Sequence, residues 1–440
     1  MAELLTRLDL RGATGALDDL LPAPGAIPEG PIDVVRDILL QVRRDGDRAL
    51  RDLTERLDGV RIDTLRVPPA ALQAALAAIP RELRTAFEVA HESITAYHRT
   101  QIHPDSVHHH AGVTVRDRRQ PVDRAGCYVP GGLAPLASTV LMTAVPARVA
   151  GVGTVVLCSP PGPDGMIAAP ILAAAAIAGV DEVYRVGGAQ AIAAMAYGTA
   201  SIAPVDVIVG PGNVYVALAE RLVAQDGVVG VPSSFPGPSE VAVVADETTP
   251  VALAAIDLVV QAEHGPNGWA WLVTWSETAA QAIEDEVARL TAASPRRDAI
   301  TATLDRGGFS VLVDGPAQAM EVVNHVATEH LELMTADPES LVPLVRSAGA
   351  VFVGPWAPAS VGDYVAGPNH VLPTARSARF SSALRVDDFC KHLHVVSLDR
   401  EALAGLAPHV VAMANAEGLG AHAASVELRA TLDQPAEVAR

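Results

Sequence analysis

The segment Asp257–Gly265 (DLVVQAEHG) begins with apolar residues at helical spacing and ends in a polar cluster. Gln261 and His264 are three residues apart, so on a helix their side chains share one face. An amide oxygen and an imidazole nitrogen on one face are groups that zinc accepts as ligands. The same two side chains also suit a helix cap or a solvated surface. This segment alone therefore leaves the metal interpretation open.

Acidic and imidazole side chains recur in three later segments. They are Thr328–Glu332 (TEHLE), Gly362–His370 (GDYVAGPNH) and Glu417–His422 (EGLGAH). A zinc enzyme needs about four ligands, which converge from distant parts of a chain. General acid–base chemistry needs further His or Glu side chains that do not bind the metal. The chain supplies both sets, but spacing alone does not assign each residue to one of them.

Glycine-rich turns follow three strand-like runs. They are Tyr128–Gly132 (YVPGG), Gly187–Gln190 (GGAQ) and Gly210–Asn213 (GPGN). Glycine lets the backbone approach a phosphate group closely, although it also serves tight packing turns. The dinucleotide fingerprint G-x-G-x-x-G does not follow the first strand. These turns are therefore compatible with a nucleotide but do not require one.

Strand-like and helical segments alternate from about residue 126 onward. One unit comprises residues 154–157, 167–179 and 182–186, a second comprises residues 240–245, 250–263 and 269–274, and further short strands are expected at 205–209, 310–313 and 350–353. Strands that alternate with helices predict an α/β fold with mostly parallel sheets. Two such units predict two Rossmann-like domains.

Two other regions have a distinct character. Apolar stripes over residues 31–60 and 69–99 predict helices before the first strand. Three adjacent histidines, His108, His109 and His110, follow in a polar stretch. Adjacent side chains point in different directions on a helix or a strand, so a solvated loop is predicted there rather than a metal site.

Composition excludes several classes of protein. The formal net charge of −19 over 440 residues argues against a sequence-independent nucleic-acid partner. Cys127, Cys158 and Cys390 are scattered and form no CxxC pair, which argues against a disulfide framework or a thiolate zinc site. The apolar runs fall short of the ~20 residues that a membrane helix needs, and charges interrupt the first apolar run. We expect a cytoplasmic protein with no nucleic-acid or membrane partner.

Eight short motifs, taken together, resemble the L-histidinol dehydrogenase family in order and in approximate spacing. They are YVPGG (128–132), VGGAQAIAA (186–194), GPGNVYVA (210–217), GPSEV (237–241), QAEHG (261–265), EHLE (329–332), GDYVAGPNHVLPT (362–374) and AEGLGAH (416–422). The resemblance extends over nearly the whole chain, including the helical start at residues 34–50. Each motif is weak by itself, but their combination is specific.

The resemblance implies an α/β fold with two Rossmann-like domains of the aldehyde-dehydrogenase-like kind, plus a helical N-terminal and a small C-terminal extension. The implied division is an N-terminal arm (1–24), a discontinuous domain with the metal and acid–base residues (25–127 and 240–383), a cofactor-binding domain (128–239) and a C-terminal dimerisation segment (384–440).

The implied activity is the oxidation of L-histidinol to L-histidine through the aldehyde, a four-electron reaction that ends histidine biosynthesis. The resemblance also implies two NAD per reaction, one Zn²⁺ per subunit and a homodimer with sites shared between subunits. In that arrangement Glu417 and His422 act in the partner subunit's site.

The implied site residues fall into four sets. The metal ligands are Gln261, His264, Asp363 and His422; the catalytic pair is Glu329 and His330; substrate contacts are Ser239, Gln261, His264, His330, Asp363, His370, Glu417 and His422; cofactor contacts are Tyr128, Gln190 and Asn213. A neutral His330 suits removal of the hydroxyl proton near pH 7. Glu329, with a pKa raised in a partly dry site, suits activation of water in the second oxidation.

Some positions depart from the usual family pattern or suggest another reading. Pro232, within Val229–Ser239, stands where the family usually has Asp, and that segment is one residue longer. Arg385 replaces a usually small residue; it favours an anionic substrate if it faces the site, and a surface position is the alternative. These departures keep open a paralogous zinc- and NAD-dependent dehydrogenase for another small polar alcohol, including an anionic one. A non-catalytic zinc-binding protein is a further alternative.

Cys127 precedes the first glycine turn. It suggests either a nucleophile that forms a thiohemiacetal with the aldehyde or an ordinary buried thiol.

Overall fold

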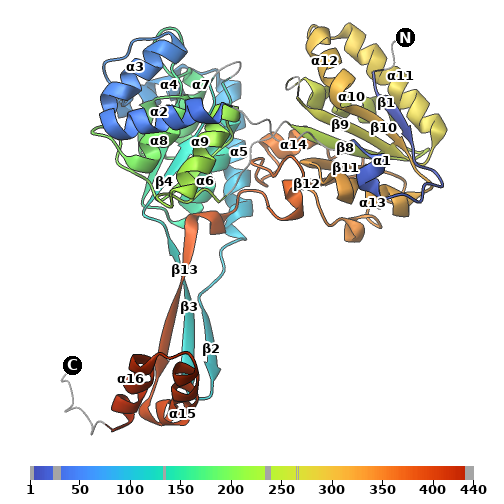
Figure 1. The fold of residues 1–440 in the computed structure, drawn as a ribbon. Coiled ribbons are helices and arrows are strands. Elements are labelled where there is room, and N and C mark those ends of the chain that lie inside the picture. The colour runs from blue at the N-terminus through green and yellow to red at the C-terminus, as the bar shows by residue number, and fades with distance from the viewer. Residues whose placement is uncertain are drawn as a thin grey trace. The chain divides into compact units, whose positions relative to one another are not determined.

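The computed structural model describes residues 4–22, 31–131, 135–232, 239–263, 265 and 267–431. The chain forms two compact units. The first joins the chain up to Gln101 with Val122–Phe389, and the second joins Ile102–Pro121 with the chain from Cys390 onward. Figure 1 labels most of the elements of both units. In the described ranges, no helix is long and apolar enough to cross a membrane.

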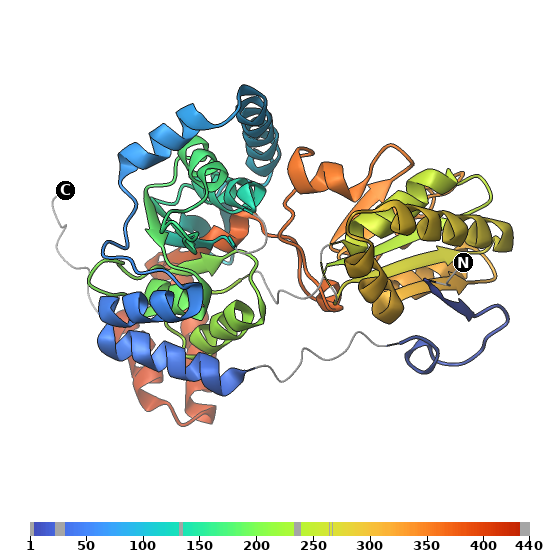
Figure 2. The ribbon, with the colours of Figure 1, turned by 90° about the horizontal axis from the view of Figure 1, so that it is seen from above.

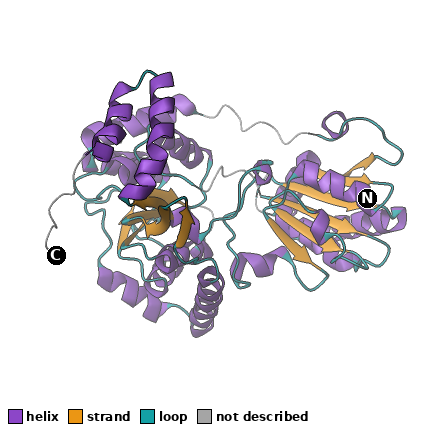
Figure 3. Cartoon of the chain, turned by 90° about the horizontal axis from the view of Figure 1, so that it is seen from below, coloured by secondary structure: helices purple, strands orange, loops and turns teal. Residues whose placement is uncertain are grey.

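A six-stranded sheet in the first unit has the order β1-β10-β9-β8-β11-β12, and every neighbouring pair is parallel. Its strands are β1 (Thr6–Asp9), β8 (Glu240–Ala245), β9 (Trp269–Thr274), β10 (Gly308–Leu312), β11 (His330–Met334) and β12 (Ala350–Val353). The accompanying helices are α1 (Leu17–Leu20), α10 (Val251–Ala262), α11 (Glu277–Ala293), α12 (Arg297–Gly307), α13 (Pro316–Val326) and α14 (Ala359–Tyr364). Short 3-10 turns are η1 (Val342–Leu344), η2 (Ser377–Arg379) and η3 (Val386–Phe389). Helices lie on both sides of this sheet (Figure 3), as crossovers between parallel strands require.

A four-stranded parallel sheet in the same unit has the order β6-β5-β4-β7. Its strands are β4 (Arg124–Tyr128), β5 (Thr154–Ser159), β6 (Glu182–Arg185) and β7 (Val207–Val209). The helices around it are α2 (Ile32–Asp45), α3 (Asp47–Asp58), α4 (Pro69–Ala78), α5 (Arg81–Arg99), α6 (Ala137–Ala150), α7 (Ala169–Ile177), α8 (Gly188–Tyr197) and α9 (Val214–Gln225). Helix α2 contacts α8, helix α4 contacts α7, and helix α5 contacts α6.

Successive residues of each strand enter two different apolar clusters, one on each face of the sheet. Both faces of both sheets are therefore buried. In β5, Val155 and Leu157 enter one apolar cluster, whereas Val156 and Cys158 enter another. In β8 the clusters alternate in the same way, and α10–α12 cover one face of that sheet (Figure 2). This alternation explains why the strands are almost continuously apolar in sequence.

The second unit is a three-stranded antiparallel sheet with two helices. Its strand order is β13-β3-β2, from β2 (Ser106–His110), β3 (Val113–Pro121) and β13 (Cys390–Leu398). The helices are α15 (Arg400–Ala416) and α16 (Gly420–Thr431), and they contact each other. Asp399 caps α15 by accepting a hydrogen bond from the backbone N–H of Ala402.

The structure confirms the predicted α/β fold with two mostly parallel Rossmann-like sheets. The predicted bounds of β8, β9 and β12 coincide with those observed. The predicted loop at His108–His110 is wrong, because these residues form strand β2 and pair with β3. Their side chains are nevertheless exposed, as a solvated segment requires.

The contacts also differ from the predicted division of the chain. The prediction places residues 25–127 in the same domain as the six-stranded sheet, but α2, α4 and α5 contact the helices of the four-stranded sheet. Strand β1, from the predicted N-terminal arm, pairs with β10 at the edge of the six-stranded sheet. The remaining domain boundaries stay predictions.

Candidate active site

The predicted acid–base residues lie where two neighbouring parallel strands begin. Glu240 is the first residue of β8, His330 is the first residue of β11, and His330 is in register with Val241. Glu329 and Ser239 directly precede the two strands. Helix α10 returns antiparallel to β8, so its C-terminal end, which carries Gln261, comes back to this amino edge of the sheet.

The backbone of Glu240 holds both catalytic candidates. Its N–H donates a hydrogen bond of 3.0 Å to Oε2 of Glu329. Its carbonyl oxygen lies 3.0 Å from Nδ1 of His330. A carbonyl only accepts, so Nδ1 must carry the proton, and Nε2 is the ring atom that can exchange one with a substrate.

Burial and charge together set the protonation of this group. Burial raises the pKa of Glu329 to about 7. Burial, helped by the charge of Glu329, raises the pKa of Glu240 to about 8. Burial acts to lower the pKa of His330, but the carboxylates of Glu329 and Asp363 outweigh it and raise that pKa to about 9. The carboxylates thus favour a protonated ring near pH 7, whereas the sequence suggested a neutral one.

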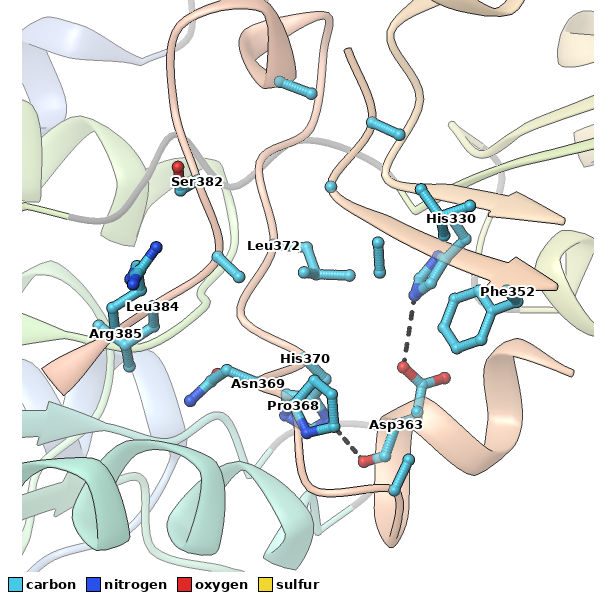
Figure 4. Close-up of a pocket in the computed structure, with 18 of the residues that line it drawn as sticks. His330, Phe352, Asp363, Pro368, Asn369, His370, Leu372, Ser382, Leu384 and Arg385 are labelled. Carbon is cyan, nitrogen blue, oxygen red and sulfur yellow. Dashed lines mark hydrogen bonds and ion pairs between the residues drawn. The ribbon is translucent and has the colours of Figure 1, made fainter. Parts of the chain in front are cut away.

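Asp363 and His370 complete the cluster from the segment after β12. Oδ1 of Asp363 lies 3.4 Å from Nε2 of His330, which is an electrostatic contact longer than a good hydrogen bond. The carbonyl oxygen of Asp363 lies 2.8 Å from Nδ1 of His370. Burial lowers the pKa of His370, so the neutral ring is favoured there. Figure 4 shows both contacts as dashed lines.

These groups line a pocket of about 480 Å³, within the size range of small-molecule sites. Asn369, which lines this pocket, is buried and its side chain is hydrogen-bonded. The Asn369 side-chain amide donates to the carbonyl oxygen of Met142 at 2.6 Å, and its Oδ1 accepts from the backbone N–H of Val371 at 2.9 Å. His98, which is fully buried, lies beside this amide at 3.5 Å.

A pair of carboxyl groups, from Glu332 on β11 and Asp257 on α10, lies near these residues. Glu332 is two residues after His330 on β11, so both side chains leave the strand on the same side. Its Oε1 accepts a hydrogen bond of 2.9 Å from the backbone N–H of Ala359, the first residue of α14. Burial raises the pKa values of Glu332 and Asp257, and the two carboxyl groups are in contact. Burial, together with the repulsion that two adjacent carboxylates would have, favours an uncharged carboxyl group in this pair.

This carboxyl pair connects the elements that carry two of the predicted metal ligands. Asp257 lies on α10 one helical turn before Gln261, and Glu332 holds the start of α14, which carries Asp363. The pair therefore aligns α10 and α14 with the strand that carries His330. The sequence did not predict a functional role for Glu332 or Glu240. Glu332 belongs to the motif EHLE, and Glu240 belongs to the motif GPSEV.

The donor chemistry at this edge fits a zinc ion. Gln261 is 4% exposed, and its side-chain nitrogen has no hydrogen-bond partner in the described part of the chain, so the amide is buried without satisfaction. The terminal atoms of an amide are assigned rather than observed, so either orientation can offer its oxygen to a metal. Asp363 adds a carboxylate as a second possible ligand.

The other two predicted metal ligands are not found at this site. His264 lies outside the described residues, and His422 is exposed on α16 of the second unit. Within the described ranges, no three His, Cys, Asp or Glu side chains cluster as a metal site.

The three predicted cofactor residues line one cavity of about 1150 Å³. The hydroxyl of Tyr128 accepts a hydrogen bond of 3.0 Å from the N–H of Gly188 at the start of α8. Asn213 caps α9 by accepting from the N–H groups of Tyr215 and Val216. Gln190 is buried, and its side-chain oxygen has no partner among the described atoms. Two helix N-termini at the carboxyl edge of a parallel sheet suit phosphate groups.

The remaining predicted residues have different surroundings. Ser239 is half-buried beside Glu240, and its carbonyl oxygen accepts from the N–H of Trp269 at 3.1 Å. Glu417 is exposed in the second unit. Cys127 is fully buried, and burial raises its pKa to about 12, which excludes a ready thiolate and leaves the ordinary buried thiol.

The fold and the buried acid–base group define an α/β enzyme built on two parallel sheets. The family model for histidinol dehydrogenase matches residues 29–430. The chain is 47% identical over 405 residues to a histidinol dehydrogenase of Parasynechococcus marenigrum (strain WH8102), covering 91% of each protein. It is 46% identical over 434 residues to that of Thermobifida fusca (strain YX), covering 98% of each. The crystal structure of histidinol dehydrogenase from Elizabethkingia anophelis superposes with a TM-score of 0.93 at 32% identity, again covering 98% of each chain.

The chain therefore belongs to the histidinol dehydrogenase family, as the eight motifs suggested. It is an oxidoreductase of a family that serves histidine biosynthesis.

Glu332→Gln is expected to make folding less sensitive to alkaline pH. The folded chain keeps a proton on the Asp257–Glu332 pair that the unfolded chain releases above the ordinary glutamate pKa of 4.5. A carboxyl group whose pKa is raised in the folded state stabilises the fold at low pH. That contribution to the free energy of unfolding is lost as the pH rises toward the folded-state pKa. An amide has no such proton, so the free energy of unfolding should fall less between about pH 5 and pH 8. Denaturant unfolding at several pH values measures this.

Glu339→Gln, at an exposed position, is the matched control and should leave the pH dependence of the wild type unchanged. Parallel pH curves for the wild type and Glu332→Gln would show that the pair does not retain a proton.

Proposed function

We propose that this chain oxidises L-histidinol to L-histidine with two NAD and one zinc ion per subunit. The single observation that carries the proposal is the buried Glu329–His330 pair, fixed by the backbone of Glu240 beside a pocket of small-molecule size. Membership of the histidinol dehydrogenase family supports the choice of substrate. The cavity around Tyr128, Gln190 and Asn213 supports a dinucleotide.

In the first oxidation the alcohol carbon gives a hydride to NAD and the hydroxyl gives up a proton. His330 Nε2 is the acceptor, because Nδ1 is committed to the carbonyl oxygen of Glu240. If zinc were to share the Asp363 carboxylate, that carboxylate would stabilise an imidazolium less strongly, and His330 would then lose its proton more easily and accept the one from the hydroxyl. The nicotinamide performs the hydride chemistry, and the protein orients it.

In the second oxidation water adds to the aldehyde, and the hydrate gives a second hydride to NAD. Glu329, with its pKa raised to about 7 by burial, can remove a proton from that water near neutral pH. Its Oε2 accepts a hydrogen bond from the N–H of Glu240, which fixes the position of this carboxylate. Bound zinc would orient the substrate and polarise its oxygen.

The proposed zinc ligands are Gln261, His264, Asp363 and His422, and the proposed substrate contacts include Ser239, His370 and Glu417. Because His422 and Glu417 lie in the second unit, we place them in the site of the partner subunit of a homodimer. Their exposure on that unit supports a role at a surface between subunits. The buried, unsatisfied amide of Gln261 supports its role as a ligand.

Zinc-loaded protein with a limiting amount of L-histidinol is expected to release two NADH per histidinol, because alcohol to acid removes four electrons. Absorbance at the NADH band measures the stoichiometry, with a reaction lacking substrate as the control. A rate of order 1 s⁻¹ is ordinary for a working enzyme. One NADH per histidinol would limit the activity to the alcohol step, and none would reject histidinol as the substrate.

His330→Asn is expected to slow the first oxidation by roughly 10²- to 10⁴-fold, the usual contribution of a general base. Its zinc content should stay near one per chain, because the imidazole is proposed as a base and not as a ligand. Stopped-flow NADH formation and metal analysis measure the two effects. His325→Asn, on α13 outside the pocket, is the control. Loss of zinc from His330→Asn would mean that base and ligand have been confused.

Glu329→Gln is expected to slow oxidation of the aldehyde more than oxidation of the alcohol, because only the second step activates water. Separate assays that start from the alcohol and from the aldehyde measure the difference. Glu321→Gln, exposed on α13, is the control. Unchanged turnover of the aldehyde would remove Glu329 from this role.

A further inference from the structure

Strand β2 gives the histidine run His108–His110 a geometry that a loop would not have. On a strand, successive side chains point to opposite faces, so residues two apart share one face. His108 and His110 therefore lie on one face of the sheet, and His109 lies on the other. Adjacent histidines still point apart, but the pair with one residue between them does not.

The imidazole rings of His108 and His110 lie side by side. Their ring centroids are 6.2 Å apart, and the two ring planes differ by 19°. Both residues are exposed. Within the described part of the chain, neither ring takes part in a hydrogen bond or an ion pair. The nitrogens of both rings are therefore available to a ligand from solvent.

His109 differs from its two neighbours in its contacts. Its Nδ1 lies 2.8 Å from Oγ1 of Thr114, which is the residue directly opposite on β3. This cross-strand contact engages one nitrogen of the ring on the other face of the sheet. The same exposed strand thus carries a third imidazole that cannot join the other two without turning the strand over.

Strand pairing fixes the backbone beneath the pair. β2 is an edge strand, and it pairs with β3 in antiparallel register (Figure 1). His108 is directly opposite Val115, which is half-buried. The pairing keeps the Cα atoms of the two histidines roughly 6.8 Å apart, two residues along an antiparallel strand. From that spacing, rotation about the side-chain bonds can bring one nitrogen of each ring to ~2.0–2.1 Å from a single ion.

We propose that His108 and His110 form a surface binding site for a divalent transition-metal ion of the Cu²⁺, Ni²⁺ and Zn²⁺ class. Imidazole suits these ions, and Cu²⁺ is expected to bind most tightly in the general order of affinities. Water fills the remaining positions, because within the described ranges no three His, Cys, Asp or Glu side chains cluster as a metal site. The net charge of −19 also favours a cation over an anion at the surface.

This site is independent of the proposed dehydrogenase function. It shares no residue with the proposed catalytic zinc site, whose ligands come from other segments. Its ligands are imidazoles on a regular strand, whereas a flexible run of three histidines would offer all three rings equally. The difference between those two arrangements is the contribution of His109, and it can be measured.

The test is Ni²⁺ binding by the full-length, zinc-loaded protein without an affinity tag, after excess zinc is removed. Titration calorimetry should detect Ni²⁺ binding to the wild type. His108→Asn and His110→Asn should each weaken it by at least about tenfold, which is the smallest usual effect even of residues outside the ligand set. His109→Asn is the matched control and should leave the Ni²⁺ affinity unchanged, because its ring lies on the other face. Exchange of Ni²⁺ into the proposed catalytic site would be common to all variants.

Three results would overturn the site. Equal weakening by all three substitutions would mean that the run binds metal as a flexible tag does. Equal affinity in the wild type, His108→Asn and His110→Asn would place Ni²⁺ elsewhere, for example at the exposed His392 and His394. Absence of Ni²⁺ binding by the wild type would reject a metal site at β2 outright. Because the readout is metal binding and not NADH release, failure of the proposed function would leave each of these results interpretable.

Discussion

One peptide unit at the start of β8 is the contact on which the candidate site depends. The N–H of Glu240 holds the carboxylate of Glu329, and its carbonyl oxygen holds Nδ1 of His330. Both hydrogen bonds require that β8 and β11 be neighbours in this parallel register. A shift of one residue would turn His330 to the other face of the sheet. The geometry of the candidate acid–base pair is therefore set by the pairing of β8 with β11.

Sheet topology explains why the other groups reach the same place. In a crossover unit the helix runs antiparallel to its strand, so a helix C-terminus returns to the amino edge of the sheet. This brings Gln261 on α10 and Asp363 on α14 back toward the starts of β8 and β11. The proposed cofactor cavity lies instead at the carboxyl edge of the four-stranded sheet, beside the N-termini of α8 and α9, which is the usual place for phosphate groups. The candidate acid–base residues thus lie at the amino edge of the six-stranded sheet, and the proposed cofactor cavity lies at the carboxyl edge of the four-stranded sheet.

The sequence predicted the fold well because buried parallel strands are apolar runs, and β8, β9 and β12 begin and end where those runs do. It predicted Glu329 and His330 through motifs, and the structure shows them in contact at 3.6 Å. It could not show that backbone atoms of Glu240 hold this pair, because backbone hydrogen bonds leave no signature in residue types. It also could not show that Asp257 and Glu332, 75 positions apart in the chain, are close enough for each to affect the other's pKa. The sequence also suggested a neutral His330, whereas the adjacent carboxylate of Glu329 and that of Asp363, from a distant segment, outweigh burial and raise its pKa to about 9. The strand that contains His108–His110 was not predicted, because its side chains are exposed and its sequence shows no alternation of apolar and polar residues.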